Sequence, residues 1–293
     1  MATLSDWLEG ARLRTLPAAV APVVLGTGAA VGLGAASPVR ALLAAGVALT
    51  LQVGVNFAND YSDGVRGTDD VRTGPPRLTG GGKASPATVK RAAILALAVG
   101  ALLGLVLVAV SGAWWLLALG VLAIAAAWGY TGGSRPYGYL GLGEVGVFLF
   151  FGLMATLGTL WTQAGSLPWT AWAGAAGVGL IACALLMVNN IRDIPTDSQV
   201  GKTTLAVLLG DHRSRLTYVA MIALPVVLGV LAATVSPWAL LVLVLLPWVV
   251  RLSRVVLGGA AGRDLIVVLR DTGLLELAYG VLLGLGLALS ALG

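Results

Sequence analysis

Long apolar stretches, each about the length of a membrane-spanning helix, alternate with short polar segments along the whole chain. A helix needs about 20 mainly apolar residues to cross the hydrocarbon core of a bilayer. Nine stretches meet this requirement, at residues 16–34, 40–59, 91–111, 113–130, 143–163, 170–190, 215–234, 237–257 and 272–292. The pattern predicts an all-α polytopic membrane protein with about nine transmembrane helices. The polar breaks between consecutive apolar stretches are shortest at the turns 111–113 and 234–237.

The basic residues fall on one side of this predicted topology. All but one of the 18 Lys and Arg residues lie in the N-terminal tail or in segments on the same side, and Arg40 alone falls on the other. Positively charged loops mark the cytoplasmic face of a membrane protein. We therefore expect a protein of the cell membrane with its N-terminus and polar loops in the cytoplasm and its C-terminus outside. With 58% hydrophobic and 11% charged residues, the composition excludes an ordinary soluble domain.

A first polar cluster, NFANDYSD (56–63), ends the second apolar stretch. If the helix continues through it, Asn56, Asn59, Asp60 and Asp63 are spaced at i, i+3, i+4 and i+7 and share one face. Isolated carboxylates at a helix end can simply lie at the membrane–water interface and have no functional role. A second, matching cluster argues against that interpretation.

The second cluster, NNIRDIPTD (189–197), ends the sixth apolar stretch and contains Asn189, Asn190, Asp193 and Asp197. Pro195 leaves two alternatives open, because proline can kink a helix or end it early. A polar loop with a Gly-Lys pair follows each cluster. We therefore expect one transmembrane domain, residues 1–293, with two weakly duplicated halves and Asp-rich motifs at 56–69 and 189–197.

Several carboxylates close to one another would repel, and a divalent cation would relieve that repulsion. Oxygen ligands without nearby His or Cys suit Mg²⁺, which prefers a few carboxylates together with substrate phosphates. The residue types therefore predict Asp60, Asp63, Asp193 and Asp197 as metal-binding catalytic residues, assisted by the motif asparagines. Cationic side chains that could bind phosphate flank both motifs, namely Arg72, Arg77, Lys83, Arg192 and Lys202. Together they predict a Mg²⁺–diphosphate site at the membrane surface.

Both clusters resemble the Asp-rich motifs of the UbiA-type intramembrane prenyltransferases. The opening ARLRTLPAAVAPVVLGTG (11–28) and the loop YTGGSRPYGYLGLGE (130–144) are similar to the subgroup that acts on 1,4-dihydroxy-2-naphthoate. One position departs from the broad family pattern, since Gly67 stands where a third Asp is usual and Asp69 follows two residues later. The resemblance implies a ring of nine helices around a central cavity that is open sideways to the lipid bilayer.

The resemblance also implies a reaction. A polyprenyl group would pass from polyprenyl diphosphate to 1,4-dihydroxy-2-naphthoate, with loss of CO₂ and diphosphate, to give demethylmenaquinol. Tyr130, Tyr137 and Tyr139 would face the carbocation-like carbon through cation–π contact. Arg12, Arg14 or Arg135 would pair with the carboxylate of the acceptor. Asn56, Asn59 and Asn190 would assist the metal ligands.

Two alternatives remain open. The first is the same chemistry on another acceptor, such as 4-hydroxybenzoate, homogentisate, haem or a glycerol phosphate lipid. The second is a cation-coupled transporter, which would place charges near the middle of the membrane and need access from both sides. The outer half of the predicted helices carries almost no charge, and this favours chemistry at one face. We expect no nucleic-acid partner and see no sign of a protein partner.

Overall fold

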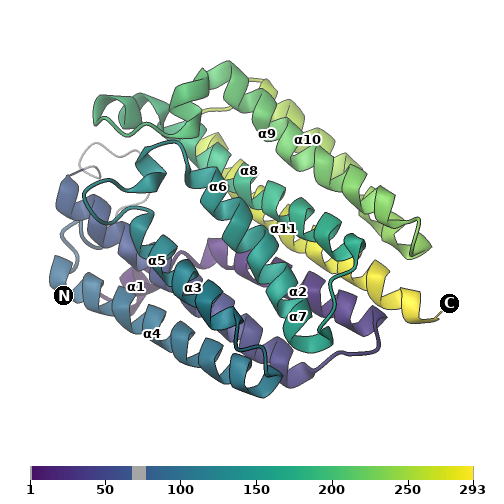
Figure 1. The fold of residues 1–293 in the computed structure, drawn as a ribbon. Coiled ribbons are helices and arrows are strands. Elements are labelled where there is room, and N and C mark those ends of the chain that lie inside the picture. Colours follow the sequence, from purple (N-terminus) through teal and green to yellow (C-terminus); the bar gives the residue numbers. More distant parts are fainter. Residues whose placement is uncertain (1, 68–76, 293) are drawn as a thin grey trace.

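The structure, a computed structural model, describes residues 2–67 and 77–292 (Figure 1). In these residues the chain is almost entirely helical and contains no strand. In chain order the helices are α1 (Leu4–Ala11), η1 (Leu13–Thr15), α2 (Leu16–Gly32), α3 (Pro38–Arg66), α4 (Pro86–Ser111), α5 (Leu116–Gly129), η2 (Tyr137–Tyr139), α6 (Gly143–Val147), η3 (Phe148–Met154), α7 (Ala155–Ala164), α8 (Trp169–Gln199), α9 (Leu205–Ala232), η4 (Pro237–Leu245), α10 (Leu246–Leu257), α11 (Arg263–Ala288) and η5 (Leu289–Leu292).

The long helices run back and forth along one bundle (Figure 1). Within the described residues, eight helical segments are long and apolar enough to cross a membrane, if three groups are each counted as one segment: α1 to α2, α6 to α7, and η4 with α10. The remaining predicted span, residues 113–130, corresponds to α5, which has only 14 residues. At 1.5 Å per residue, α5 is about 21 Å long, less than the roughly 30 Å hydrocarbon core. The predicted fold class is confirmed, with one crossing shorter than expected.

The two shortest predicted breaks are both present. Gly112 ends α4 in the left-handed conformation, with φ 73°. Between α9 and η4, Ser236 precedes Pro237, which starts the next helix. An odd number of crossings places the two termini at opposite ends of the bundle, as Figure 1 shows. The end that holds the N-terminus also holds both Asp-rich motifs, and we call it the motif end.

The second motif is helical throughout, and so is the first motif up to Arg66. α3 continues past Asp63 to Arg66 and is capped by Gly67, which has φ 74°. α8 continues past Pro195 to Gln199, so the helix does not end early. Pro195 lacks the N–H for a helical bond to the Ile191 carbonyl oxygen, and the helix nevertheless continues through it. Asp193 and Asp197 therefore stand one turn apart on the same face of α8.

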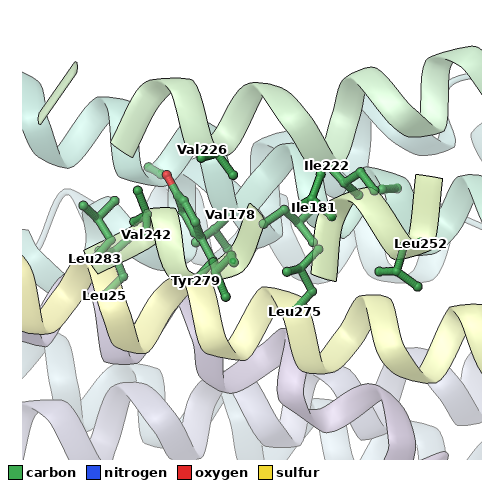
Figure 2. Packing of buried hydrophobic residues seen from close by; sticks show 14 of the residues in the cluster. Leu25, Val178, Ile181, Ile222, Val226, Val242, Leu252, Leu275, Tyr279 and Leu283 are labelled. Carbon is green, nitrogen blue, oxygen red and sulfur yellow. The ribbon is translucent and has the colours of Figure 1, made fainter. Parts of the chain in front are cut away.

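The largest packed core lies where α2, α8, α9, α10 and α11 meet. Figure 2 shows buried side chains from these helices in contact, including Leu25, Val178, Ile222, Leu252 and Tyr279. The buried residues of this cluster form a continuous packed side of the bundle, against which the motif helix α8 is fixed.

Small residues let α2 and α11 approach closely. A Cβ atom added at Gly28 would lie 2.3 Å from the carbonyl oxygen of Gly284, and one added at Gly280 would lie 2.6 Å from the carbonyl oxygen of Ala21. Such contacts are typical of helix pairs in membranes, where close backbone packing replaces much of the hydrophobic driving force. The backbones of α2 and α11 are therefore in close contact at these glycines.

We expect the Gly28→Ala variant to be less stable than the wild type, because one backbone must move to admit the new methyl group. Overpacking of this kind costs about 1–3 kcal/mol, which thermal unfolding in detergent would detect. Gly158→Ala is the matched control. Gly158 is also helical, but a Cβ added there meets no atom within 4 Å, and alanine favours a helix over glycine by up to about 1 kcal/mol. Equal melting temperatures for the two variants would contradict the prediction.

Candidate active site

A cavity of about 440 Å³ runs between α2, α3, α4, α5, η3, α7 and α8. Over most of its length the wall is apolar and consists of side chains such as Val47, Leu51 and Ile124. Toward the far end the wall includes Gly158 and Thr162. At the motif end it becomes polar. This shape suits an amphiphile with a long apolar tail and a charged head.

The π-helical segment η3 shapes the middle of the cavity. Its consecutive residues Phe150 and Phe151 both line the wall. On its other side, Gly152 packs so closely on Gly179 of α8 that an added Cβ would lie 2.4 Å from the Gly179 Cα atom. Segments with π geometry are rare and often lie at functional sites.

Only some side chains of the first motif line the cavity. Asn56, Asn59 and Asp63 line the cavity. Asp60, which is 1% exposed, accepts hydrogen bonds from the backbone N–H groups of Leu78 (2.9 Å) and Thr79 (2.8 Å). Its carboxylate therefore fixes the segment after the loop and does not line the cavity.

Asp63 is the carboxylate of the first motif that the structure brings to the cavity. It accepts a hydrogen bond from the Tyr139 hydroxyl at 2.8 Å. The Arg77 guanidinium lies 3.4 Å from the other carboxylate oxygen. All three side chains come from different segments of the chain, so this contact depends on the tertiary fold.

The second motif presents Asn189, Asn190 and Asp193 to the same cavity. The Arg192 guanidinium pairs with both oxygens of Asp193, each at 2.7 Å. Asp197 is buried, and the Lys202 ammonium lies 3.5 Å from one of its oxygens. The other oxygen of Asp197 is buried without a hydrogen-bond partner in the described part of the chain.

Tyr139 connects the two motifs. Besides donating to Asp63, its ring lies 5.3 Å from the cations of both Arg66 and Lys202. Its carbonyl oxygen accepts a hydrogen bond from the N–H of Thr203 at 3.1 Å. The loop 130–144 therefore holds the ends of α3 and α8 together.

The three predicted asparagines have specific partners. Asn56 donates to the Ala11 carbonyl oxygen at 2.9 Å and to the Thr15 hydroxyl at 3.2 Å. Asn59 accepts from the Thr131 hydroxyl at 2.8 Å. Asn190 donates to the Glu144 carboxylate at 3.2 Å.

Lys83, a predicted phosphate ligand, and Arg135, predicted to pair with the acceptor carboxylate, do not line the cavity. The Lys83 ammonium lies 2.7 Å from Asp6 and 3.6 Å from Glu9, and the hydrogen bond to Asp6 raises the pKa of Lys83. Arg135 is exposed. The predicted residue Arg72, together with Asp69, lies outside the described residues.

Tyrosines close the polar end of the cavity. The rings of Tyr130 and Tyr137 pack edge to face at 5.5 Å between centroids, and both line the cavity. Burial raises the pKa of Tyr137 to about 12, so its hydroxyl stays protonated and can donate a hydrogen bond. Tyr139 stands just outside this wall.

Other polar residues of this region were not among the predicted ligands. Glu144 is 5% exposed and lies at the start of α6. As an acid at the start of an apolar stretch, it carried a signal in the sequence. Gln52 also lines the cavity, and it extends the polar face of α3 by one further turn from Asn56.

Among the described residues, no three His, Cys, Asp or Glu side chains lie close enough together to hold a metal ion by themselves. The four motif carboxylates therefore do not form one compact cluster. Each has its own hydrogen-bonding or cationic neighbour in the structure.

Fold and site together define a helical membrane protein with an apolar cavity that ends, at the motif end of the bundle, in acidic and cationic side chains. The model of the UbiA prenyltransferase family matches residues 19–264. The 1,4-dihydroxy-2-naphthoate octaprenyltransferase of Mycobacterium tuberculosis is 51% identical over the full length of both chains. This chain therefore belongs to the UbiA prenyltransferase family, and it is a membrane-embedded prenyltransferase.

Solved structures share the fold. The apo structure of a UbiA homolog from Aeropyrum pernix K1 has a TM-score of 0.69 at 18% identity, with 92% of this chain and 96% of that chain covered. A UbiA homolog from Archaeoglobus fulgidus bound to DMAPP and Mg²⁺ has a TM-score of 0.65 at 13% identity, with 95% and 98% covered.

Proposed function

We propose that this enzyme transfers a polyprenyl group from polyprenyl diphosphate to 1,4-dihydroxy-2-naphthoate in a Mg²⁺-dependent reaction. Diphosphate and CO₂ are released and demethylmenaquinol is formed. The observation that carries the proposal is one continuous cavity, which joins an apolar channel to a polar end where Asp63 and Asp193 approach from two helices. The name of the M. tuberculosis relative supports the choice of acceptor.

The donor set at the polar end fits Mg²⁺. Asp63, Asp193 and Asp197 offer only oxygen ligands, and one buried oxygen of Asp197 has no partner among the described residues. Mg²⁺ usually takes few protein ligands and completes its shell with water and substrate phosphates, which agrees with the lack of a compact three-acid cluster. When bound, the ion stabilises the negative charge of the leaving diphosphate. The A. fulgidus homolog bound to DMAPP and Mg²⁺ supports this assignment.

Arg77, Arg192 and Lys202 lie beside the motif carboxylates and supply the positive charge that diphosphate oxygens require. The allylic C–O bond of the donor breaks, and its electron pair leaves with the diphosphate. Tyr130 and Tyr137 present their rings to the electron-poor carbon. The electron-rich naphthalene ring attacks that carbon, and the C–C bond to the carboxylate then breaks, so that its electron pair restores the aromatic ring.

The surrounding helices exclude water, which would otherwise capture the electron-poor carbon. The apolar wall serves this need along the whole channel. The placement of nearly all basic residues at the motif end further supports an orientation with that end, and the N-terminus, in the cytoplasm. The parallel course of α3 and α8, each with its motif at the same end (Figure 1), supports the proposed duplication of two halves.

The purified protein in detergent should form prenylated naphthoquinol from polyprenyl diphosphate and 1,4-dihydroxy-2-naphthoate when Mg²⁺ is present. EDTA should abolish the product, and added Mg²⁺ should restore it. Product analysis by mass spectrometry with 4-hydroxybenzoate as a competing acceptor tests the choice of acceptor. Transfer to hydroxybenzoate instead would overturn the naphthoate assignment and keep the diphosphate site. Folded protein that transfers to neither acceptor would favour the transporter alternative.

A further inference from the structure

Two arginines on the outer surface of the bundle share one buried carboxylate. Asp271, near the motif end of α11, is 4% exposed. Its Oδ1 accepts hydrogen bonds from Nε and Nη2 of Arg270 at 2.9 and 2.8 Å, and its Oδ2 accepts one from Nη2 of Arg251 on α10 at 3.3 Å. The side chains of Arg251 and Arg270 are themselves 64% and 60% exposed. We call Arg251 and Arg270 the arginine pair.

The arginine pair carries more positive charge than its acid offsets. Within the part of the chain that the structure describes, Asp271 is the only acid whose carboxylate lies within 4 Å of either guanidinium. One carboxylate neutralises one guanidinium, so one positive charge is left at the surface of the bundle. Each guanidinium has five N–H donors, and Asp271 accepts three hydrogen bonds from the two groups together. The exposed donors can therefore bind an anion outside the bundle.

The depth of the arginine pair matches the level of the lipid phosphates. From Arg270, α11 continues for 18 residues to its end at Ala288, a length of about 27 Å at 1.5 Å per residue. The hydrocarbon core of a bilayer is about 30 Å thick. With the far end of α11 at one boundary of this core, Arg270 lies close to the other boundary, where the headgroups begin. Arg251 contacts the same carboxylate and therefore lies at the same level.

An apolar stripe continues from Arg270 along the outer face of α11. Leu274, Val281 and Leu285 are 41%, 42% and 47% exposed, and they follow Arg270 by 4, 11 and 15 residues. At about 100° per residue, these spacings place all three within about 60° of Arg270 around the helix axis. A phosphate bound by the arginine pair would thus have a surface for its own acyl chain directly beside it. This arrangement favours a phospholipid over a small soluble anion.

The helix ends that carry the arginine pair are fixed from behind. Arg215 of α9, which is 8% exposed, donates from Nη1 to the carbonyl oxygens of Val256 at 2.6 Å and Ala260 at 3.0 Å. The hydroxyl groups of Tyr218 on α9 and Thr272 on α11 share a hydrogen bond of 2.7 Å. The backbone is therefore held in place before a ligand binds, and this preorganisation lowers the cost of binding.

We propose that Arg251 and Arg270 bind the phosphate of an anionic phospholipid in the leaflet at the motif end, with an acyl chain along the stripe on α11. Guanidinium groups match phosphate oxygens through planar, paired hydrogen bonds. Basic pockets between helices on the cytoplasmic side of membrane proteins bind anionic headgroups in this way.

The general attraction of basic loops to the membrane does not account for the arginine pair. Arg251 lies six residues before the end of α10 and Arg270 seven residues after the start of α11, which is about two helical turns from the connecting loop in each case. Both are also arranged around a buried acid. Neither arginine lines the cavity of the candidate active site, so the lipid site is separate from it.

Arg251→Gln is the first variant to test, because Asp271 keeps its hydrogen bonds to Arg270 and the fold should be retained. Native mass spectrometry of the protein in detergent, titrated with phosphatidylglycerol, measures the Kd of the most tightly bound lipid. We expect this Kd to rise about tenfold in Arg251→Gln, as loss of a charge-assisted hydrogen bond implies. The wild type should bind phosphatidylcholine of the same chain length more weakly than phosphatidylglycerol. Arg263→Gln removes an exposed arginine at the start of α11, and as the matched control it should change the Kd far less.

Asp271→Asn tests the charge balance in the opposite direction. It removes the negative charge of the site and keeps an oxygen that can accept a hydrogen bond, so the affinity for phosphatidylglycerol should rise. A purely structural role of the arginine pair predicts no such rise. The comparison of Arg251→Gln with Arg263→Gln decides the proposal by itself if Asp271→Asn does not fold.

Three results would overturn the proposal. The first is equal affinity of the wild type for phosphatidylglycerol and phosphatidylcholine. The second is an equal loss of affinity in Arg251→Gln and Arg263→Gln, which would indicate only a general attraction between basic residues and the lipid. The third is a melting temperature that inorganic phosphate raises as much as phosphatidylglycerol does, because the ligand would then not need to be a lipid.

Discussion

Replacing Asp63 by Asn should lower turnover by about 100-fold to 1,000-fold, the range seen when one preorganised group that stabilises a transition state is lost. The substitution keeps the size of the side chain and an oxygen that can accept the Tyr139 hydrogen bond. It removes the negative charge that faces the cavity and pairs with Arg77. Asp193→Asn should behave in the same way. The Mg²⁺ concentration needed for half-maximal activity should rise in both variants.

Asp60→Asn provides the contrast, although the sequence placed Asp60 and Asp63 on the same face. The Asp60 carboxylate holds two backbone N–H groups of the segment after the loop in a buried position. An amide can accept through only one of its two groups, so a buried donor loses its partner at a cost of about 1–3 kcal/mol. We therefore expect the main effect of Asp60→Asn on the melting temperature and that of Asp63→Asn on turnover.

Titrating Mg²⁺ against activity and recording thermal unfolding of the same preparations would separate the two roles. A normal Mg²⁺ requirement in Asp63→Asn would contradict the catalytic role assigned to Asp63. An unchanged melting temperature together with a raised Mg²⁺ requirement in Asp60→Asn would contradict the structural role assigned to Asp60.

Filling the far part of the cavity should change which donors the enzyme accepts. A side chain at Gly158 would enter the channel, since an added Cβ meets no protein atom within 4 Å. We expect Gly158→Leu to raise the KM for long polyprenyl diphosphates by at least about tenfold and to spare geranyl diphosphate. Each displaced isoprene unit of five carbons forfeits burial worth about 4 kcal/mol at 0.8 kcal/mol per carbon. Most of this free energy is recovered if the displaced end of the polyprenyl chain moves into lipid. We therefore expect only a modest difference between the KM values for long and short donors.

Ala118→Leu is the matched control for that substitution. Ala118 lies on α5 but is exposed and does not line the cavity, so the added side chain should face lipid. KM values for donors of one to eight isoprene units would show the effect as a step at a particular length. A uniform loss with all donors would mean that Gly158→Leu disturbs the site as a whole.

The sequence predicted best those features that repeat or lie within one helix. Apolar stretches of membrane-spanning length located the crossings, and the short breaks between them located the turns at Gly112 and Pro237. The polar face of α3 was also readable, because the i, i+3, i+4 and i+7 spacing belongs to a single helix. The resemblance of the two motifs to a known family then supplied the chemistry.

Contacts between distant segments were not readable in the same way. Asp60 and Asp63 look equivalent in sequence, and only the position of the backbone at 78–79 separates their roles. Lys83 follows a glycine-rich turn that suggested a phosphate ligand, but α1 brings Asp6 within 2.7 Å of its ammonium.

The close fit of α2 to α11 has a consequence for biogenesis. These are the first and the last long helices to leave the ribosome, and their glycine contacts cannot form until the whole chain has been inserted. Until then α2 has only part of its final packing surface, and the wall of the channel that it contributes is held from one side. Insertion of α11 is therefore the step that completes the packing of α2, and a variant that lacks α11 would leave α2 without these glycine contacts.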